Sequence, residues 1–332
     1  MTKLSEVPLD ISPTTRCIYD HYKKSGDCQR PRGYLGASII GHSCERYLWY
    51  TFRACCLPPF DGRMYRLFST GEREESRVCS DLQSIGCACI LLDENSEQFA
   101  ISFLGGHFAG HLDGVVKGIP EAPTTWHVLE CKTHNTKSFN KLKQDGVKSS
   151  KSAHYAQMQI YMHGTGMTRA LYFAVCKETD EIYTERVRYD KDEAAALLER
   201  AERIIRNPIV PERISSRSDY YECKWCDAHD ICHGCEKALP LPSISCKQCC
   251  YATPVTTESG AKWKCEKLEI SSSNLQPCSN HLCLPGLFPY AIPTDCTDGL
   301  ICFKNKDDGK EWNHGGFDYS TKDLMAKTRE EL

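Results

Sequence analysis

The chain has 332 residues, a formal net charge of −3 and 22 cysteines. Its length allows one sizeable core and a smaller module. The near-neutral charge excludes a global attraction to nucleic acid, so any DNA contact must use a local patch. The first residues lack the apolar run of a secretory signal and no stretch approaches membrane-spanning length, which predicts a cytoplasmic protein without a membrane partner. In that compartment cysteines are expected to bind metal rather than to form disulfides.

The apolar spacing predicts alternating helices and strands after a polar, irregular N-terminal arm at 1–35. In chain order we expect a helix at 36–52, a helix at 66–83, strands at 99–103, 108–116 and 125–132, a helix at 153–163, strands at 170–176 and 181–189, and a helix at 192–206. This order predicts an α/β fold built on a mixed sheet, with residues 36–237 as one domain. Some cysteines lie in apolar or helical settings and are expected to be buried: Cys55, Cys56, Cys79, Cys87, Cys89 and Cys176.

Two carboxylates and a lysine stand on neighbouring predicted strands. Asp113 lies in the 108–116 segment, and Glu130 and Lys132 close the 125–132 segment. If the strands pair antiparallel, Asp113 and Glu130 lie side by side, and paired carboxylates hold a hard cation such as Mg²⁺. Lys132 points to the same face as Glu130 and can orient or deprotonate an attacking water. The layout is typical of metal-assisted phosphodiester hydrolysis, the alternative being a solvated strand edge.

Lysines gather between Lys132 and Lys151, where Asp145 is the single acid. This segment is predicted to contact DNA, although an ordinary solvated loop would have the same composition. The lysines assigned to DNA are Lys137, Lys141, Lys143, Lys148 and Lys151. On the next predicted helix Gln157 and Tyr161 are four residues apart and share one face. From that face Gln157 can hydrogen-bond the lysine or a phosphate, whereas the tyrosine alternatively packs in the core.

Together these residues resemble the RecB-like branch of the PD-(D/E)xK nuclease superfamily. In that branch an acidic or histidine residue on an upstream helix precedes Gly-x-x-Asp, Glu-x-Lys and Gln-x-x-x-Tyr. The matching residues occur here in the same order: Glu75, Gly110 to Asp113, Glu130 to Lys132, and Gln157 to Tyr161. The resemblance covers about residues 36–235. It implies a restriction-endonuclease-like core and a Mg²⁺- or Mn²⁺-dependent DNA exonuclease.

The resemblance also implies a role for each matching residue. Asp113, Glu130, the backbone carbonyl of Cys131 and Glu75 would be the metal ligands, with Glu72 competing for the last place. Lys132 would activate water, and Gln157 would position the lysine or the DNA. Tyr161 would belong to the same catalytic set. The substrate would be linear DNA with ends, in recombination, repair or end processing in bacteria or phages, with a recombination or single-strand-annealing protein as partner. The alternatives are a structure-specific endonuclease or resolvase, and a catalytically silent DNA-binding subunit.

A cysteine pattern independent of the carboxylates flanks the domain. Cys223, Cys226 and Cys232 follow the last predicted helix, while Cys44 stands far upstream. One distant and three clustered cysteines resemble the iron–sulfur staple of the CRISPR-associated RecB-like exonucleases and the AddB-type nucleases. That resemblance implies a structural 4Fe–4S cluster bound by these thiolates. The competing interpretation is a zinc site in which Cys235 replaces Cys44.

The composition changes after residue 237. A Leu-Pro-Leu-Pro linker at 238–245 is predicted to lead into a zinc-ribbon-like module at 246–290 and a polar tail at 291–332. The expected Zn²⁺ ligands surround a hairpin that turns at 258–260: Cys246, Cys249, Cys265 and Cys278. One alternative set has His281 as a ligand in place of Cys265, and a less favoured one uses Cys250 or Cys283. The last alternative is that these cysteines are reduced and bind no metal.

Overall fold

The computed structural model describes residues 12–27, 32–58 and 60–332. The helices are α1 (Pro13–Asp27), α2 (Glu45–Phe52), α3 (Gly62–Ser84), α4 (Thr136–Ser150), α5 (Ser152–Thr165), α6 (Lys191–Arg206), α7 (Tyr221–Lys224), α8 (His229–His233) and α9 (Thr321–Ala326), with short 3-10 turns that include η1 (Ala37–Ile39), η2 (Leu104–Gly106) and η3 (Cys246–Gln248). The strands are β1 (Leu35–Gly36), β2 (Ala88–Ile90), β3 (Ala100–Phe103), β4 (Phe108–His111), β5 (Gly114–Lys117), β6 (His127–His134), β7 (Arg169–Cys176), β8 (Ile182–Arg188), β9 (Ala252–Thr257), β10 (Gly260–Cys265), β11 (Ile270–Ser272), β12 (Ala291–Thr297), β13 (Leu300–Asn305) and β14 (Glu311–Gly315).

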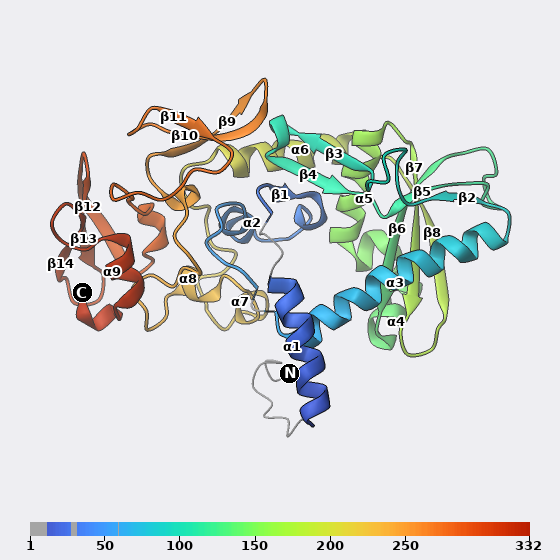
Figure 1. The fold of residues 1–332 in the computed structure, drawn as a ribbon, viewed down its shortest axis with the longest axis horizontal. Coiled ribbons are helices and arrows are strands. Elements are labelled where there is room, and N and C mark those ends of the chain that lie inside the picture. Colours follow the sequence, from blue (N-terminus) through green and yellow to red (C-terminus); the bar gives the residue numbers. More distant parts are fainter. Residues whose placement is uncertain (1–11, 28–31, 59) are drawn as a thin grey trace.

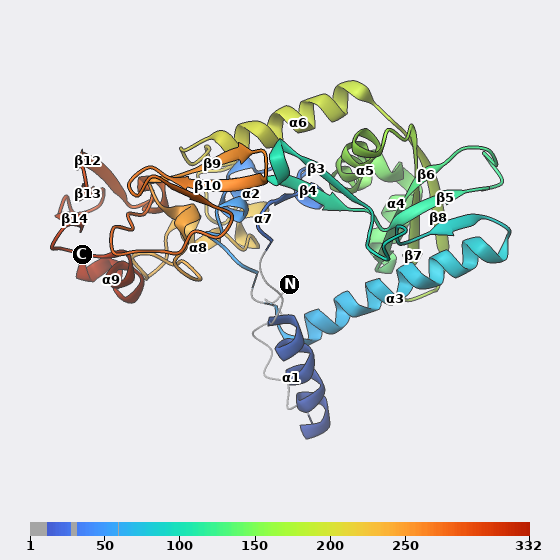
Figure 2. The same cartoon turned by 45° about the horizontal axis from the view of Figure 1, so that its top comes forward.

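A five-stranded sheet in the order β2-β5-β6-β7-β8 organises one half of the molecule (Figure 1). β6 and β7 are parallel and the other neighbours antiparallel, which confirms the predicted α/β fold with a mixed sheet. Because side chains alternate along β6, Leu129 and Cys131 pack under α3 with Val78, whereas Val128 joins the core beneath α4 and α5. The sheet is therefore covered on both faces (Figure 2).

The segment predicted as one strand at 108–116 is divided between two sheets. β4 belongs to a small sheet in the order β1-β4-β3, and β5 enters the five-stranded sheet. The chain bends between His111 and Gly114, so that Asp113 lies immediately before β5 rather than within a strand. The apolar run could not reveal this break because both halves are buried.

Two predictions about the N-terminal half are wrong in part, and one helix was missed. The arm at 1–35 contains α1, which packs on α3, where a Cβ on Gly62 would lie 1.8 Å from Tyr19 O. The helix predicted at 36–52 begins only at Glu45, since the preceding residues form β1 and η1, and Gly41 lies against α5. The lysine-rich segment, for which a solvated loop was the alternative interpretation and no helix was predicted, forms α4, which is capped by Asn135 and buried through Phe139, Leu142 and Val147.

The C-terminal predictions also change. The 238–245 linker is not a solvated tether, because Ala238, Leu239 and Leu241 are buried. The 291–332 tail is folded: β12, β13 and β14 form an antiparallel sheet, in which Phe303 stacks on Trp312 at 4.5 Å between ring centroids. The hairpin of β9 and β10 turns at the predicted position, with Thr257 opposite Gly260.

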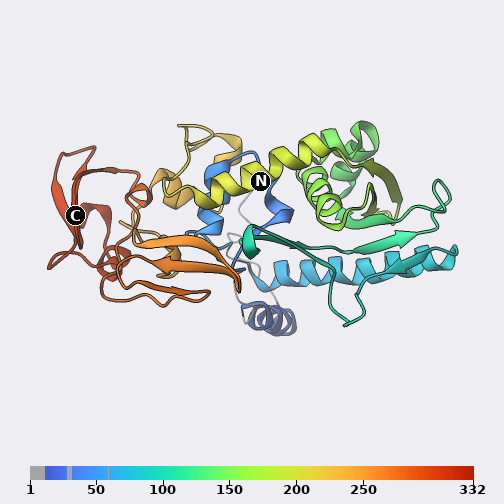
Figure 3. The same ribbon diagram turned by 90° about the horizontal axis from the view of Figure 1, so that it is seen from above.

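The long helix α6 joins the two halves of the elongated molecule. Figure 3 shows α6 running along one side and α3 along the other, and α6 packs on α5, α2 and β9. The predicted burial of Cys55, Cys56, Cys79, Cys87, Cys89 and Cys176 is confirmed. None of the described helices combines the length and apolar character of a membrane-crossing segment.

Candidate active site

Asp113, Glu130 and Lys132 meet where β5 and β6 pair. Gly114 lies opposite Leu129 in the register, which brings Asp113 beside Glu130. Lys132 Nζ lies 3.6 Å from Asp113 Oδ2 and contacts the Glu130 carboxylate directly. Asp113 Oδ2 also accepts a hydrogen bond of 2.8 Å from the Cys131 amide. The expected antiparallel arrangement thus brings the three predicted residues together.

Glu130 is completely buried, and burial makes the ionisation of its carboxyl group costly, a cost that the Lys132 ammonium reduces. Burial raises the pKa of Glu130 to about 8, with Asp113 adding to the effect and Lys132 opposing it. Its Oε2 has no hydrogen-bond partner among the described residues. A buried, incompletely paired carboxylate is costly, and oxygen donors of this kind suit a hard divalent cation. The Cys131 carbonyl, which accepts from Lys132 Nζ at 3.1 Å, supplies a further oxygen at the same place.

Lys132 is held as an ammonium in this arrangement. Burial by itself would lower the pKa of Lys132, but the Glu130 and Asp113 carboxylates outweigh it and raise the pKa. The lysine therefore occupies the space between the two carboxylates and offsets their mutual repulsion.

A third carboxylate approaches from α3. Burial raises the pKa of Glu75 to about 7, and Asp113 adds to the rise while Lys132 opposes it. Glu75 lines an open cavity with Glu72, Cys131 and Lys132. Since Asp113 and Lys132 both act on Glu75, this residue suits the third acidic position better than Glu72 does.

Gln157 and Tyr161 reach the site from the buried face of α5. Gln157 Nε2 donates to Tyr161 OH at 3.0 Å, so the amide is engaged with the tyrosine rather than with Lys132. Burial, followed by the Glu130 carboxylate, raises the pKa of Tyr161. Gly110 packs directly on this ring, because a Cβ there would lie 2.7 Å from Tyr161 Cε1.

The lysines in and next to α4 differ in whether their ammonium groups already have a partner within the protein. Lys143 Nζ pairs with Glu181 at 2.7 Å, and Lys148 lies over the Tyr155 ring at 4.8 Å. The half-buried Lys151, the residue that follows the end of α4, donates to Ser138 on that helix. Lys137 and Lys141 are exposed and form no ion pair within the described chain, so they are the lysines most available to an anion.

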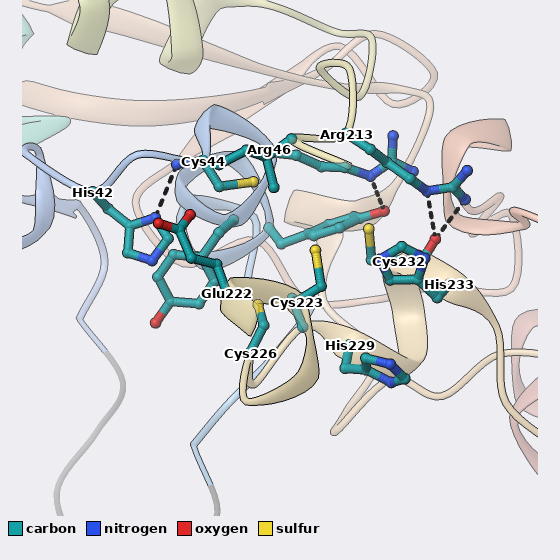
Figure 4. Close-up of a pocket in the computed structure, with 14 residues that line it drawn as sticks. His42, Cys44, Arg46, Arg213, Glu222, Cys223, Cys226, His229, Cys232 and His233 are labelled. Carbon is teal, nitrogen blue, oxygen red and sulfur yellow. Dashed lines mark hydrogen bonds between the residues drawn. The ribbon is translucent and has the colours of Figure 1, made fainter. Parts of the chain in front are cut away.

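The four cysteines of the expected iron–sulfur set line one cavity between α2, α7 and α8: Cys44, Cys223, Cys226 and Cys232. Their sulfur atoms point toward a shared space in Figure 4. Burial raises the pKa of Cys226 to about 11, and Cys44 and Cys232 contribute to this rise. Cys235 lies outside the cavity, and its thiol contacts the carbonyl of Lys237. The placement favours the set with Cys44.

A second cavity gathers the cysteines of the expected zinc set: Cys246, Cys249, Cys265 and Cys278. His281 also lines it, but its ring nitrogens lie 2.9 Å from Thr321 Oγ1 and 3.0 Å from Ser245 O. The Cys250 thiol instead contacts the Cys283 carbonyl. These contacts favour the four cysteines over His281, Cys250 or Cys283 as ligands.

No three His, Cys, Asp or Glu side chains in residues 12–27, 32–58 and 60–332 are arranged as a group that could hold a metal ion. Metal binding at the carboxylates and at both cysteine cavities is accordingly a proposal.

Sequence reasoning did not identify a set of three polar side chains beside the candidate site, His134, Tyr172 and His154. His134 follows Lys132 on the same face of β6, Tyr172 lies opposite Glu130 on β7, and His154 precedes Gln157 by three residues on α5. The alternation along β6 and the helical spacing were the signals that could have identified the two histidines.

No family model and no curated protein matches the chain. Among solved structures it is similar to SSO0001, with a TM-score of 0.41 and 15% identity over 67% of this chain and 96% of that one. It is also similar to the alkaline exonuclease LHK-Exo from Laribacter hongkongensis, with a TM-score of 0.36 and 15% identity over 56% and 90% of the two chains. For the structure of LHK-Exo in complex with dAMP the TM-score is 0.37, with 15% identity over 52% of this chain and 86% of that one.

Proposed function

We propose that this chain is a divalent-metal-dependent DNA exonuclease of the RecB-like PD-(D/E)xK type. The observation that carries the proposal is the meeting of Asp113, Glu130 and Lys132 around a buried carboxylate oxygen that has no hydrogen-bond partner in the described part of the chain. Gln157 and Tyr161 close the same site from α5. A binding protein has no need of two carboxylates and a lysine forced together away from water.

The oxygen donors suit Mg²⁺ or Mn²⁺. Asp113, Glu130 and the Cys131 carbonyl would hold the cation, with Glu75 completing the set. When bound, such a cation polarises the phosphodiester and makes a coordinated water more acidic. The carboxylates that hold Lys132 as an ammonium would then be engaged as ligands, so the pKa of Lys132 would fall and its amine could accept the proton of the attacking water.

Gln157 and Tyr161 would orient the reacting groups. The glutamine amide donates to Tyr161 OH, which leaves the tyrosine hydroxyl hydrogen available for an acceptor at the site. A phosphate oxygen is such an acceptor. Linear DNA with ends, in recombination, repair or end processing, is the substrate we propose.

The test is cleavage of linear and closed circular DNA with Mg²⁺ or Mn²⁺. We expect wild-type protein to digest the linear substrate, and Lys132→Ala and Asp113→Asn to lose cleavage while still binding DNA. Lys322→Ala, an exposed change on α9, is the control. Cleavage retained by Lys132→Ala would contradict the proposed mechanism. Cleavage of the closed circular DNA would indicate an endonuclease. If the wild-type protein bound DNA but cleaved neither substrate, it would be a DNA-binding subunit.

We also propose a 4Fe–4S cluster at Cys44, Cys223, Cys226 and Cys232, and Zn²⁺ at Cys246, Cys249, Cys265 and Cys278. Four thiols line each cavity, which matches the ligand number of either group. Both would be structural. The cluster would join α2 to α7 and α8, and the zinc ion would join β10 to the segments on either side of the ribbon.

A further inference from the structure

A chain of polar side chains crosses the same face of the sheet as the proposed active site, and the proposed mechanism leaves it unused. Lys151 Nζ donates to Ser138 Oγ at 2.6 Å, and Ser138 Oγ lies 3.1 Å from His134 Nδ1. His134 Nε2 lies 2.9 Å from Tyr172 OH, which in turn lies 2.8 Å from His154 Nδ1. These contacts form one continuous series that ends at His154.

The series has a direction. An ammonium group only donates, so Ser138 Oγ accepts from Lys151. The serine hydroxyl hydrogen has His134 Nδ1 as its acceptor among the described residues. With the serine donating to Nδ1, His134 carries its hydrogen on Nε2 and donates to Tyr172; the opposite tautomer would leave the serine hydroxyl hydrogen without an acceptor among the described residues.

Tyr172 consequently donates its own hydrogen to His154 Nδ1. His154 must therefore carry its hydrogen on Nε2. Neutral rings are required for this pattern, and burial, reinforced by nearby lysines, lowers the pKa of His134 to about 4 and that of His154 to about 3.

The outer end of the series lies next to the catalytic groups. His154 precedes Gln157 by one helical turn on α5, and the charge of Lys132 acts on its ring. The residue is half-buried, and its hydrogen bond among the described residues is made through Nδ1, which leaves Nε2 free for a ligand. A fixed N–H donor thus stands near Lys132 and Gln157, and no acceptor for it lies among the described residues.

We propose that His154 is a substrate-positioning residue whose Nε2–H donates to a non-bridging phosphate oxygen of the DNA backbone, next to the phosphodiester that is cleaved. Tyr172 and His134 hold its tautomer. The opposite tautomer would turn a lone pair toward the phosphate and repel it, so the role requires the whole series. This inference rests on the proposed nuclease function, and it adds to that function a specific phosphate contact.

The kinetic test uses His154→Ala, Tyr172→Phe and their double variant on linear DNA. Because a hydrogen bond to a charged group is lost, we expect kcat/KM to fall roughly 10- to 100-fold in each single variant. The double variant should be no slower than His154→Ala, since Tyr172 acts through His154. His154→Gln, which keeps an amide donor near the Nε2 position, should recover part of the loss.

The matched control lies on the same helix. His163 Nδ1 lies 2.7 Å from Tyr189 OH, in an exposed histidine–tyrosine pair, and His163→Ala should leave kcat/KM unchanged. Unchanged kcat/KM in His154→Ala would overturn the proposal. Additive losses in the double variant would overturn it too, because they would show that Tyr172 and His154 act separately.

A spectroscopic test does not depend on cleavage. Nitrogen-15 NMR of the histidine rings should show His154 with its hydrogen on Nε2, and this resonance should shift when a single-stranded deoxyoligonucleotide is added in Ca²⁺. A hydrogen on Nδ1, or no shift on binding, would overturn the assignment. A wild-type protein that binds the oligonucleotide with this shift but never cleaves DNA would refute the nuclease proposal while keeping the phosphate contact.

Discussion

Gly110 and Tyr161 lie so close together that a Cβ on residue 110 would be 2.7 Å from Tyr161 Cε1 and 2.8 Å from Ala37 Cβ. The glycine lies on β4 and the tyrosine on α5, so this contact ties the small sheet to the helix that covers the larger one. The close approach explains why a glycine is found at position 110, because any larger residue would clash with the Tyr161 ring and with Ala37.

Replacing Gly110 with alanine should displace Tyr161 and lower nuclease activity. Overpacking of a filled core costs about 1–3 kcal/mol, so the free energy of unfolding should fall by that amount. Thermal or urea unfolding, with the cleavage rate, measures both effects. Gly71→Ala on α3 is the control, because no atom of residues 12–27, 32–58 and 60–332 lies within 4 Å of a Cβ there. Within a helix, the Gly71→Ala change should raise the free energy of unfolding by about 0.5–1 kcal/mol. Equal changes in stability and cleavage rate in the two variants would contradict the close contact between Gly110 and Tyr161.

The buried histidines should make the protein sensitive to acid. The pKa of His134 is lowered to about 4 and that of His154 to about 3, whereas an unfolded histidine keeps an ordinary value. Below pH about 6.5 the unfolded chain binds protons that the native state does not, so stability is full above this pH and falls toward pH 4. His154→Gln should flatten this dependence, measured as urea midpoints at both ends of the range. His163→Gln should leave it as in the wild type, and an unaltered slope in His154→Gln would show that His154 does not titrate as expected.

Loss of Cys44 should remove the proposed iron–sulfur cluster. In anaerobically purified protein we expect iron and sulfide together with broad visible absorbance, all absent from Cys44→Ser. The variant should also be less stable, since the cluster would join helices far apart in the chain. Cys235→Ser is the control and should keep its iron. Protein with zinc but no iron, and loss of that zinc in Cys235→Ser, would support the alternative zinc site instead.

Removal of the proposed zinc ion should disturb the proposed active site through the hairpin of β9 and β10. Thr256 Oγ1 donates to Leu104 O at 3.1 Å, and His107 Nε2 lies 3.0 Å from Val255 O. These contacts join the β9 strand to the loop just before β4. In Cys278→Ser we expect loss of zinc, faster hydrogen exchange in β4 and reduced cleavage. Cys250→Ser should retain zinc, and zinc-free protein with unchanged exchange in β4 would argue against this coupling.

The α4 lysines should contribute unequally to DNA binding. Lys137→Ala and Lys141→Ala are each expected to weaken binding and to reduce the salt dependence of the association constant by about one unit of slope. Lys143→Ala should have a smaller effect, because this lysine is paired with Glu181 at 2.7 Å. Titrations at several salt concentrations provide the comparison. Equal losses in all three would show that the ion pair with Glu181 opens when DNA binds.

Local spacing was sufficient to predict which of these side chains lie together at the candidate site. Alternation along a strand places Glu130 and Lys132 on one face, and the helical repeat places Gln157 beside Tyr161. Such patterns follow from backbone geometry within a few residues, so they can be read from the sequence without knowledge of the fold. The mixed α/β arrangement follows from the same periodicities.

Contacts between distant segments decided the rest. The α4 helix and the folded 291–332 region were missed because their few apolar residues gain stability only by packing on other elements. Likewise, only the packing of α2 against α7 and α8 places Cys44 rather than Cys235 beside Cys223. The hydrogen-bond series from Lys151 to His154 joins two strands and two helices. No short-range pattern specifies it, because the burial that orders these polar groups exists only once the sheet and helices have packed together.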